Sequence, residues 1–202
     1  MKKGLLAVLL AVAMAVPAFA AKGDMSVNAK LGLGVNNSLS MDMADEVYYK
    51  FDTEMPVSIG AEFFYGLMDN LSVGLGVNYG FDSKTKEFIF PVKIKTGTTN
   101  IYAAVKPEVK LESNIFSSIY LIGQLGISMI RAEFDDSDAP DLDVKSGLYF
   151  GFGIGTIIKD CFIVELVCSS ANGTLEKFFL SGEDLDVQYT ATTINVGYKF
   201  AL

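Results

Sequence analysis

The last eleven residues of the chain alternate strictly between apolar and polar side chains. The apolar positions are Ile194, Val196, Tyr198, Phe200 and Leu202. Because successive side chains of a strand point to opposite faces, these five positions form one face of an extended segment. That face includes the final residue, so no polar tail carries the strand into water. Such an ending is typical of a strand that contacts lipid and stops at the membrane boundary.

The same two-residue period recurs seven more times. We expect strands at residues 25–36, 55–66, 71–81, 100–111, 117–130, 146–158, 161–170 and 187–202. Long polar connections, at residues 37–54, 82–99, 131–145 and 171–186, alternate with short turns. This pattern predicts an all-β fold, an eight-stranded antiparallel up-and-down transmembrane β-barrel with short periplasmic turns and long extracellular loops. A soluble sandwich or lipocalin also alternates, but its apolar face lies inside and its turn lengths are not sorted between two ends.

The N-terminus is typical of a secretory signal peptide. Lys2 and Lys3 precede an apolar run at residues 5–16, and Ala18-Phe19-Ala20 supplies a small-residue cleavage site. We therefore expect a signal peptide at residues 1–20, export by the general secretory route, and a barrel domain at residues 21–202. After residue 20, no apolar run reaches the roughly 20 residues of a membrane helix.

Charge and composition exclude several kinds of function. Without Lys2 and Lys3 the chain keeps 14 of its 16 basic residues against 24 acidic ones, so nucleic acid is not an expected partner. The sequence contains no histidine, the usual general base of membrane-embedded hydrolases, and we expect neither catalytic residues nor a cofactor or metal site. Cys161 and Cys168 are too far apart along one strand to form a disulfide.

Charged residues also occur on the polar faces of the expected strands. They are Lys30, Glu62, Lys106, Glu108, Lys110, Glu165 and Lys199. A cation facing lipid costs roughly 2–4 kcal/mol at mid-membrane, so we place these side chains in the lumen. Two interpretations follow. The favoured one is a plug of ion pairs in which Glu62 and Glu165 face Lys30, Lys106 and Lys199; the alternative is a narrow, gated ion pathway.

Eight glycines share this inward face. They are Gly32, Gly34, Gly74, Gly76, Gly80, Gly151, Gly153 and Gly155. An eight-stranded barrel is barely wide enough for its own side chains. We therefore expect these glycines to leave space for Phe64, Tyr102, Tyr120 and Tyr149.

The outward aromatic residues fall near the two ends of the strands. Tyr65, Phe162, Tyr198 and Phe200 are expected at the periplasmic boundary, and Tyr79, Phe81 and Phe150 at the outer one, as two aromatic girdles. Pro107 is expected on the lipid face, without a bulge. Within the connection at residues 82–99, five of the seven residues 88–94 are apolar or aromatic. This piece could be an extra short strand; we interpret it as the extension of a hairpin beyond the membrane.

The acidic segment at residues 135–143 has the composition of a solvated loop. Its spacing differs from an EF-hand and lacks the central glycine. Weak bridging of divalent cations to lipopolysaccharide phosphates is the alternative.

The signal peptide, the eight amphipathic strands and the ending Asn195-x-Gly197-x-x-Phe200-x-Leu202 together resemble the small bacterial outer-membrane barrels. These are the transmembrane domain of the OmpA family, OmpX-like proteins and the OmpW family. The ending resembles the signal that the barrel assembly machinery recognises, carried here by Asn195, Gly197, Tyr198, Phe200 and Leu202, although the commonest form ends on an aromatic residue.

The resemblance implies a monomer in the cell outer membrane, in contact with membrane lipids and lipopolysaccharide. We expect a structural or surface-interaction role and a largely filled lumen. The alternative is a narrow OmpW-like channel for ions or small hydrophobic molecules, with a lateral exit where Pro107 weakens the ladder. A lipid-modifying enzyme is a more distant third.

Overall fold

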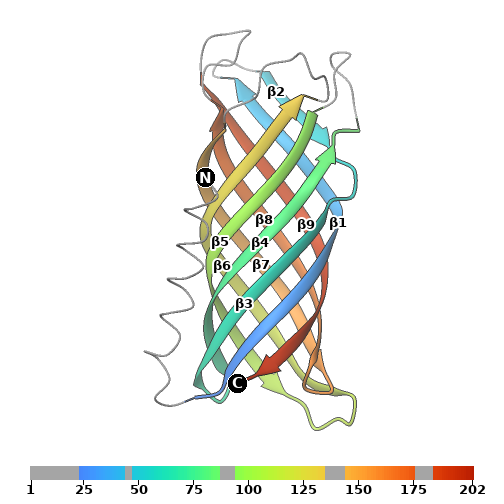
Figure 1. Cartoon of the computed structure of the whole chain (residues 1–202), viewed down its shortest axis with the longest axis vertical. Helices are drawn as coiled ribbons and strands as arrows, with labels where there is room; N and C mark the ends of the chain where they lie inside the picture. Colours follow the sequence, from blue (N-terminus) through green and yellow to red (C-terminus); the bar gives the residue numbers. More distant parts are fainter. Residues whose placement is uncertain (1–22, 44–46, 87–93, 135–143, 176–183) are drawn as a thin grey trace.

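The computed structural model describes residues 23–43, 47–86, 94–134, 144–175 and 184–202. Its strands wrap into one closed antiparallel barrel (Figure 1). The expected signal peptide, the whole acidic segment at residues 135–143 and residues 87–93 of the expected connection at 82–99 lie outside these ranges. The part of the chain that the structure describes contains no helix with the length and hydropathy needed to cross a membrane.

Nine strands form the sheet. They are β1 (Met25–Met43), β2 (Val47–Asp52), β3 (Val57–Met68), β4 (Leu71–Lys84), β5 (Ile94–Lys110), β6 (Phe116–Phe134), β7 (Val144–Ile158), β8 (Phe162–Leu175) and β9 (Leu185–Ala201). Each strand from β3 to β8 pairs with the next along the chain, and β1 pairs with β2, β3 and β9. The β1–β9 ladder closes the ring, as the alternation predicts.

The nine strands nevertheless occupy eight positions around the barrel. The reason is that β2 and β3 lie end to end along the same edge of β1. Both pair with β1 in one continuous register, from Met43 opposite Val47 to Met25 opposite Tyr65. Between β2 and β3 the Glu54 N–H donates to the Lys84 carbonyl oxygen at 2.8 Å, so this junction is also hydrogen-bonded to the end of β4. The predicted eight-stranded barrel is therefore confirmed, with its second strand divided near Pro56.

The strands extend further than expected at one end of the barrel. We predicted that β1 ends at residue 36 and that residues 37–54 form a long loop, which is wrong: β1 reaches Met43 and β2 occupies Val47–Asp52. β6 and β8 likewise reach Phe134 and Leu175. The extension is possible because these segments still alternate, and their strand-to-strand hydrogen bonds continue those of the wall.

The other end of the barrel carries tight turns. Lys159 and Asp160, which join β7 to β8, both have positive φ, at 48° and 62°. Two successive residues with positive φ match the two-residue hairpin turn whose twist suits the flanking strands. β1 starts and β9 ends at this same end of the barrel (Figure 1).

The outer wall near the tight turns is an apolar belt. Its exposed side chains include Leu31, Leu33, Val57, Ile59, Leu75, Leu121, Leu125, Ile127, Phe152, Ile154, Leu166, Ile194 and Val196. Pro107 also faces outward. The β5–β6 pairing passes over Lys106 and Pro107 with the same register on both sides, so the expected absence of a bulge is confirmed.

Polarity reverses between the two ends of the barrel. On β8, Val164 and Leu166 face outward while Glu165 is buried; nearer the other end, Asn172 is exposed while Ala171 and Leu175 are buried. In β8 the sequence itself makes this change, with no shift of register against β9.

In β1 an inserted residue contributes to the same reversal, and β4 also contains an inserted residue, beyond which the polar Ser83 and Thr85 are buried. The β1–β9 register shifts between Gly34 and Asn36, and the β4–β5 register shifts between Gly80 and Ser83. One extra residue turns every later side chain to the opposite face. A strict alternation would place Asn36 on the same inward face as Lys30; beyond the inserted residue it is exposed on the outer wall, and Leu39 is fully buried inside.

We name the buried apolar side chains beyond this reversal the apolar crown. They are Leu39, Met41, Ile130, Leu175, Leu185 and Val187, with Phe51, Ile94 and Val144 packed against them. The crown fills the inside of the barrel at the end away from the tight turns, much as the core of a soluble barrel does.

Candidate functional site

The centre of the lumen contains an ion cluster around Lys30. Its Nζ lies 2.7 Å from Glu62 Oε1 and 2.9 Å from Glu165 Oε1. Each of these three residues is no more than 5% exposed. Strands β1, β3 and β8 supply them, because each side chain occupies an inward position of its strand. Buried carboxylates are tolerated where such partners compensate their lost hydration.

Neutral side chains complete the hydrogen bonds of the two carboxylates. Tyr102 donates to Glu62 at 2.9 Å, and Tyr120 donates to Glu165 at 3.1 Å. The Asn195 amide also donates to Glu165, at 3.1 Å. A residue that we expected to serve as part of the assembly signal therefore also belongs to the lumen cluster.

Two further amides in the cluster were missed by sequence reasoning. Gln124 donates to Glu62 at 3.3 Å and accepts a hydrogen bond from Tyr149 at 2.8 Å, and Asn28 lies 3.4 Å from Glu62. Their signal in the sequence is an uncharged polar side chain at an inward position of β6 and β1. Charge alone guided the prediction, so these positions were not singled out.

Lys106 lies nearer the tight-turn end and has a different partner from the one expected. Its Nζ is 3.6 Å from Glu108 Oε2 and stands over the rings of Phe64 and Tyr120, at 4.5 and 5.1 Å from their centroids. The side chain is almost fully buried. Of the three lysines expected to face Glu62 and Glu165, the structure brings Lys30 into direct contact with both, whereas Lys106 pairs with Glu108.

The periplasmic mouth of the lumen is a depression of about 600 Å³. Lys106, Glu108, Lys110 and Lys199 line it together with the start of β1 and the end of β9. Lys110 is exposed and Lys199 is half-buried, so these two lysines border solvent rather than the central cluster.

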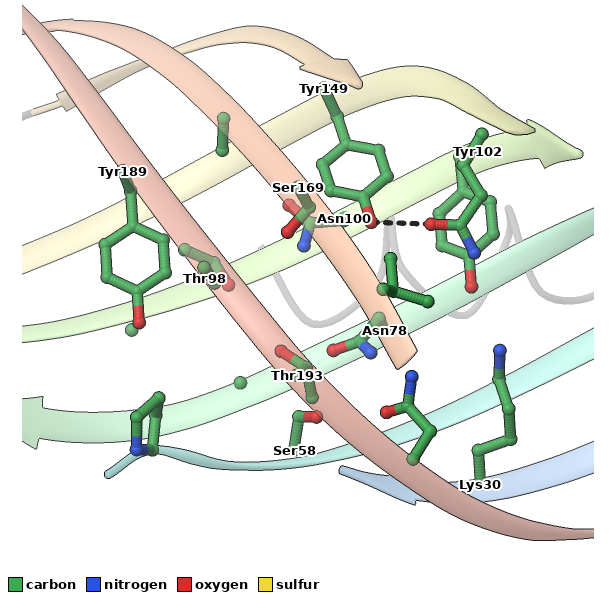
Figure 2. A pocket seen from close by; sticks show the side chains of 18 of the residues that line it. Lys30, Ser58, Asn78, Thr98, Asn100, Tyr102, Tyr149, Ser169, Tyr189 and Thr193 are labelled. Atoms are coloured by element: carbon green, nitrogen blue, oxygen red, sulfur yellow. Dashed lines mark hydrogen bonds between the residues drawn. The ribbon is translucent and has the colours of Figure 1, made fainter. Parts of the chain in front are cut away.

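A small cavity separates the ion cluster from the crown. Its volume is about 50 Å³, and Lys30, Tyr102, Gln124 and Asn195 border it at the cluster side. Tyr189 borders it at the other side, as Figure 2 shows, with hydroxyl and amide side chains between. The lumen therefore contains, in order, a wide mouth, a packed ionic layer, a small polar cavity and the crown.

The expected relation between glycines and aromatic rings is confirmed at two positions where the approach is closest. A Cβ at Gly76 would lie 2.5 Å from the Tyr102 ring, and a Cβ at Gly155 would collide with the Tyr120 ring. The rings that hydrogen-bond the two glutamates thus reach the lumen centre because the facing strands lack side chains there.

The outward aromatics form clusters near the barrel ends. The rings of Phe162 and Tyr198 pack edge to face with their centroids 5.5 Å apart, and the Phe200 centroid lies 4.7 Å from that of Tyr198. Tyr65 is paired with Met25 at this same end.

Towards the other end, Tyr79 and Phe81 form an edge-to-face pair at 5.2 Å, and Phe150 is exposed. Arg131 stands 4.6 Å over the Tyr79 ring and forms an ion pair with Asp82 at 3.3 Å. This places a cation directly beside the expected outer girdle.

The remaining assembly-signal residues lie on the seam of the ring. Gly197 opposes Lys30 and Phe200 opposes Val27 in the β1–β9 ladder. A Cβ at Gly197 would collide with the Ala29 carbonyl oxygen, so the seam is tight at this residue.

Both cysteine thiols are free. Within the described ranges, no three Cys, Asp or Glu side chains are grouped so that they could hold a metal ion.

Comparisons with known proteins agree with this architecture. The family model for the outer membrane protein beta-barrel domain matches residues 6–200. No curated protein matches the chain.

Solved structures provide three similar barrels. Ail, the attachment invasion locus protein of Yersinia pestis, solved in complex with the heparin analogue sucrose octasulfate, is 15% identical, with a TM-score of 0.53 over 89% of this chain and 100% of Ail. Neisserial surface protein A is 13% identical, with a TM-score of 0.50 over 89% of this chain and 100% of its own. OprG from Pseudomonas aeruginosa is 16% identical, with a TM-score of 0.48 over 88% of this chain and 96% of OprG. At these identities the likeness concerns the fold alone.

Proposed function

The chain belongs to the outer membrane protein beta-barrel domain family and lies in the cell outer membrane, and on this premise we propose that it is a closed, non-conducting barrel with a structural or surface-interaction role. One observation carries the proposal: the lumen is filled at two separate levels. The Lys30 cluster occupies its centre, and the apolar crown occupies the end away from the tight turns.

Each level opposes ion passage for its own physical reason. An ion crossing the crown would leave its water for packed apolar side chains, at a large cost in free energy. An ion crossing the centre would have to displace Lys30 from Glu62 and Glu165, which hold it at 2.7 and 2.9 Å. The cavity between the two levels has a volume of only about 50 Å³.

The surface role is supported by the exposed parts of the molecule. Ail and Neisserial surface protein A are named for attachment and for surface location, and both have this fold. We propose that the acidic connections at the crown end form the outward face, and that the chain is a monomer surrounded by membrane lipids and lipopolysaccharide. We propose the barrel assembly machinery as its partner during biogenesis, through the residues from Asn195 to Leu202.

We also propose that the barrel is not an enzyme. The chain has no histidine, so the general base that activates a serine or a water in most hydrolases is missing. The buried carboxylates Glu62 and Glu165 are occupied by Lys30 and their hydrogen-bond donors. Lipid A profiles of cells with and without the protein test this point; a changed acylation pattern would count against it.

Conductance in a planar lipid bilayer tests the closed lumen. We expect no reproducible single-channel steps from the purified wild-type barrel. An open outer-membrane porin, reconstituted in the same bilayer, serves as the control for assay sensitivity. Folding of both proteins is checked by the shift in gel mobility on heating. Reproducible steps from the wild type would favour the narrow channel instead.

A further inference from the structure

A groove lies on the outer wall of the barrel, at the edge of the apolar belt on β8, β9 and β1. A fully apolar row of the belt crosses these strands and consists of Leu166, Ile194 and Leu33. Two rows further from the tight turns, the side chains in register are hydroxyls, namely Ser170, Thr190 and Ser38. On β7 the residues opposite Cys168 and Ser170 are still the exposed Phe152 and Phe150. Large apolar and small polar side chains therefore meet at this place on the wall.

The wall is hollow here because short side chains lie between long ones. Phe150 and Phe152 border the hollow on β7, and Lys50 borders it on β2. The residues between them are short, and they are Asn36, Ser38, Cys168, Ser170, Thr190 and Thr192. The volume is about 380 Å³, which falls within the roughly 300–1,000 Å³ of sites for small molecules. We call this hollow the wall groove.

The polar side chains of the wall groove offer hydrogen-bond donors. Ser38 Oγ and Thr190 Oγ1 lie 2.8 Å apart, and this hydrogen bond uses one of their two hydroxyl hydrogens. Ser170 Oγ accepts from the Gln188 amide at 3.1 Å and keeps its own O–H as a donor. Lys50 adds an exposed ammonium group, and it is the single charged residue among the described ones that line the groove. This set of donors suits an anion that accepts hydrogen bonds.

Lys50 contrasts with Arg131, the cation beside the outer girdle. The guanidinium of Arg131 donates to Thr99 at 2.9 Å and forms an ion pair with Asp82 at 3.3 Å, so the protein itself supplies its partners. Lys50 forms no ion pair with any residue that the structure describes. Asp52 is exposed on the same strand, but it does not line the wall groove. The charge of Lys50 is therefore available to an external anion.

We propose that the wall groove binds the head of one outer-leaflet lipid, a phosphorylated sugar lipid of the lipid A type. A phosphate of the head accepts from Lys50 and the groove hydroxyls, and the acyl chains follow Phe150, Phe152 and the belt below them. A free phosphate ion would use the polar half of the groove alone, whereas a lipid uses both halves. The inference rests on the proposed outward orientation of the crown end, because that orientation places the groove in the outer leaflet.

Native mass spectrometry of the purified full chain, released from detergent micelles, tests the proposal. The barrel is titrated with lipid A that carries both phosphates and with the same lipid A after removal of its phosphates. We expect one molecule of the phosphorylated lipid to bind about tenfold more tightly, the factor for one hydrogen bond to a charged group. Equal binding of the two lipids would overturn the proposal, and a dimer in place of the lipid complex would assign the groove to a second copy of this chain. Conductance plays no part in this measurement, so its failure is distinct from a failure of the closed-lumen proposal.

Three variants identify where the lipid is held. Lys50→Gln removes the charge, and we expect the phosphorylated lipid to bind about fivefold more weakly, the factor for one exposed ion pair, with no change for the dephosphorylated lipid. Lys110→Gln, at the periplasmic mouth, is the matched control and should leave both affinities unchanged. Ser170→Leu combined with Thr190→Leu fills the groove and should weaken the binding of both lipids. Undiminished binding of phosphorylated lipid A to Lys50→Gln would contradict the site, and the wild-type comparison decides the proposal even if the filled variant does not assemble.

Discussion

The backbone N–H of Leu202 donates a hydrogen bond to the carbonyl oxygen of Met25, with a donor–acceptor distance of 2.9 Å. The final residue of the chain is thereby joined to the first residue of β1. From this point the β1–β9 ladder continues to the pair Asp42 and Asp186. Because the seam joins the first strand to the last, the ring cannot close before β9 is in place.

Deleting residues 200–202 is expected to impair assembly. The deletion removes the pairs Val27–Phe200 and Ser26–Ala201, the Leu202 hydrogen bond, and the Phe200 ring beside Tyr198. Unpaired edge groups are costly in lipid, where no water replaces the lost hydrogen bonds. Immunoblotting of outer-membrane fractions measures the effect. Leu202→Ala keeps the backbone bond and should lower the level less; a normal level of the truncated protein would refute the prediction.

Replacing Lys30 by methionine is expected to destabilise the barrel strongly. Glu62 and Glu165 would lose the cation that both contact, and breaking a buried ion pair from one side costs about 3–5 kcal/mol. The free energy of unfolding in urea, measured on barrels folded into phospholipid vesicles, reports the loss. Lys110→Met, at the exposed mouth, is the matched control and should change stability by no more than about 0.5 kcal/mol.

A second variant distinguishes the contribution of the charges to stability from that of side-chain packing. Lys30→Met combined with Glu62→Gln and Glu165→Gln leaves no carboxylate to compensate. We expect this triple variant to be more stable than Lys30→Met alone, because neutral amides are cheaper to bury than unpaired carboxylates. If the triple variant is the less stable of the two, the lost packing of Lys30 dominates.

Substituting Gly76 by alanine is expected to disturb the Tyr102 ring. The new Cβ would lie 2.5 Å from it, and overpacking of this kind typically costs 1–3 kcal/mol. At Gly123 the nearest heavy atom to an added Cβ is a Val105 methyl carbon at 3.4 Å, so Gly123→Ala should be tolerated. Unfolding midpoints of the two variants, and of Gly76→Ala combined with Tyr102→Ala, measure the coupling. Equal effects of Gly76→Ala with and without the ring would show that the ring is not the cause.

Truncating Leu39 tests the apolar crown. Leu39 is fully buried inside the barrel, and Leu39→Ala is expected to cost about 2–5 kcal/mol because a cavity remains. Leu31 lies on the same strand but is exposed on the apolar belt, where lipid can fill the space left by Leu31→Ala. Unfolding in lipid vesicles compares the two. A larger loss for Leu31→Ala would mean that the crown contributes little to stability.

Sequence reasoning located the eight wall positions because alternation is a local property of each strand. It also identified the inward glycines and the inward charges, since their faces follow from the strand period. It ended β1 too early because polar residues at 36–38 looked like a loop. In the structure the same residues belong to an extended strand with a bulge between Gly34 and Asn36: Asn36 is exposed, whereas Asn37 and Ser38 are buried.

The pairing of the lumen charges was only partly predictable. Lys30 is 32 residues from Glu62 and 135 residues from Glu165 in the sequence. Which inward residues meet depends on the stagger between neighbouring strands and on ring closure, and no local pattern encodes either. The amides Asn28 and Gln124 entered the cluster for the same reason.

The sequence by itself determined that this chain forms a closed barrel with an apolar belt, because a period of two and a short-turn, long-connection order leave few other folds for such strands. Only the tertiary structure decided that the inside becomes apolar towards one end. In β1 that reversal depends on a bulge, which is a property of the register between two strands. It also decided that Lys30, rather than Lys106 or Lys199, sits between the two glutamates, because the contact requires three strands to be aligned at one level.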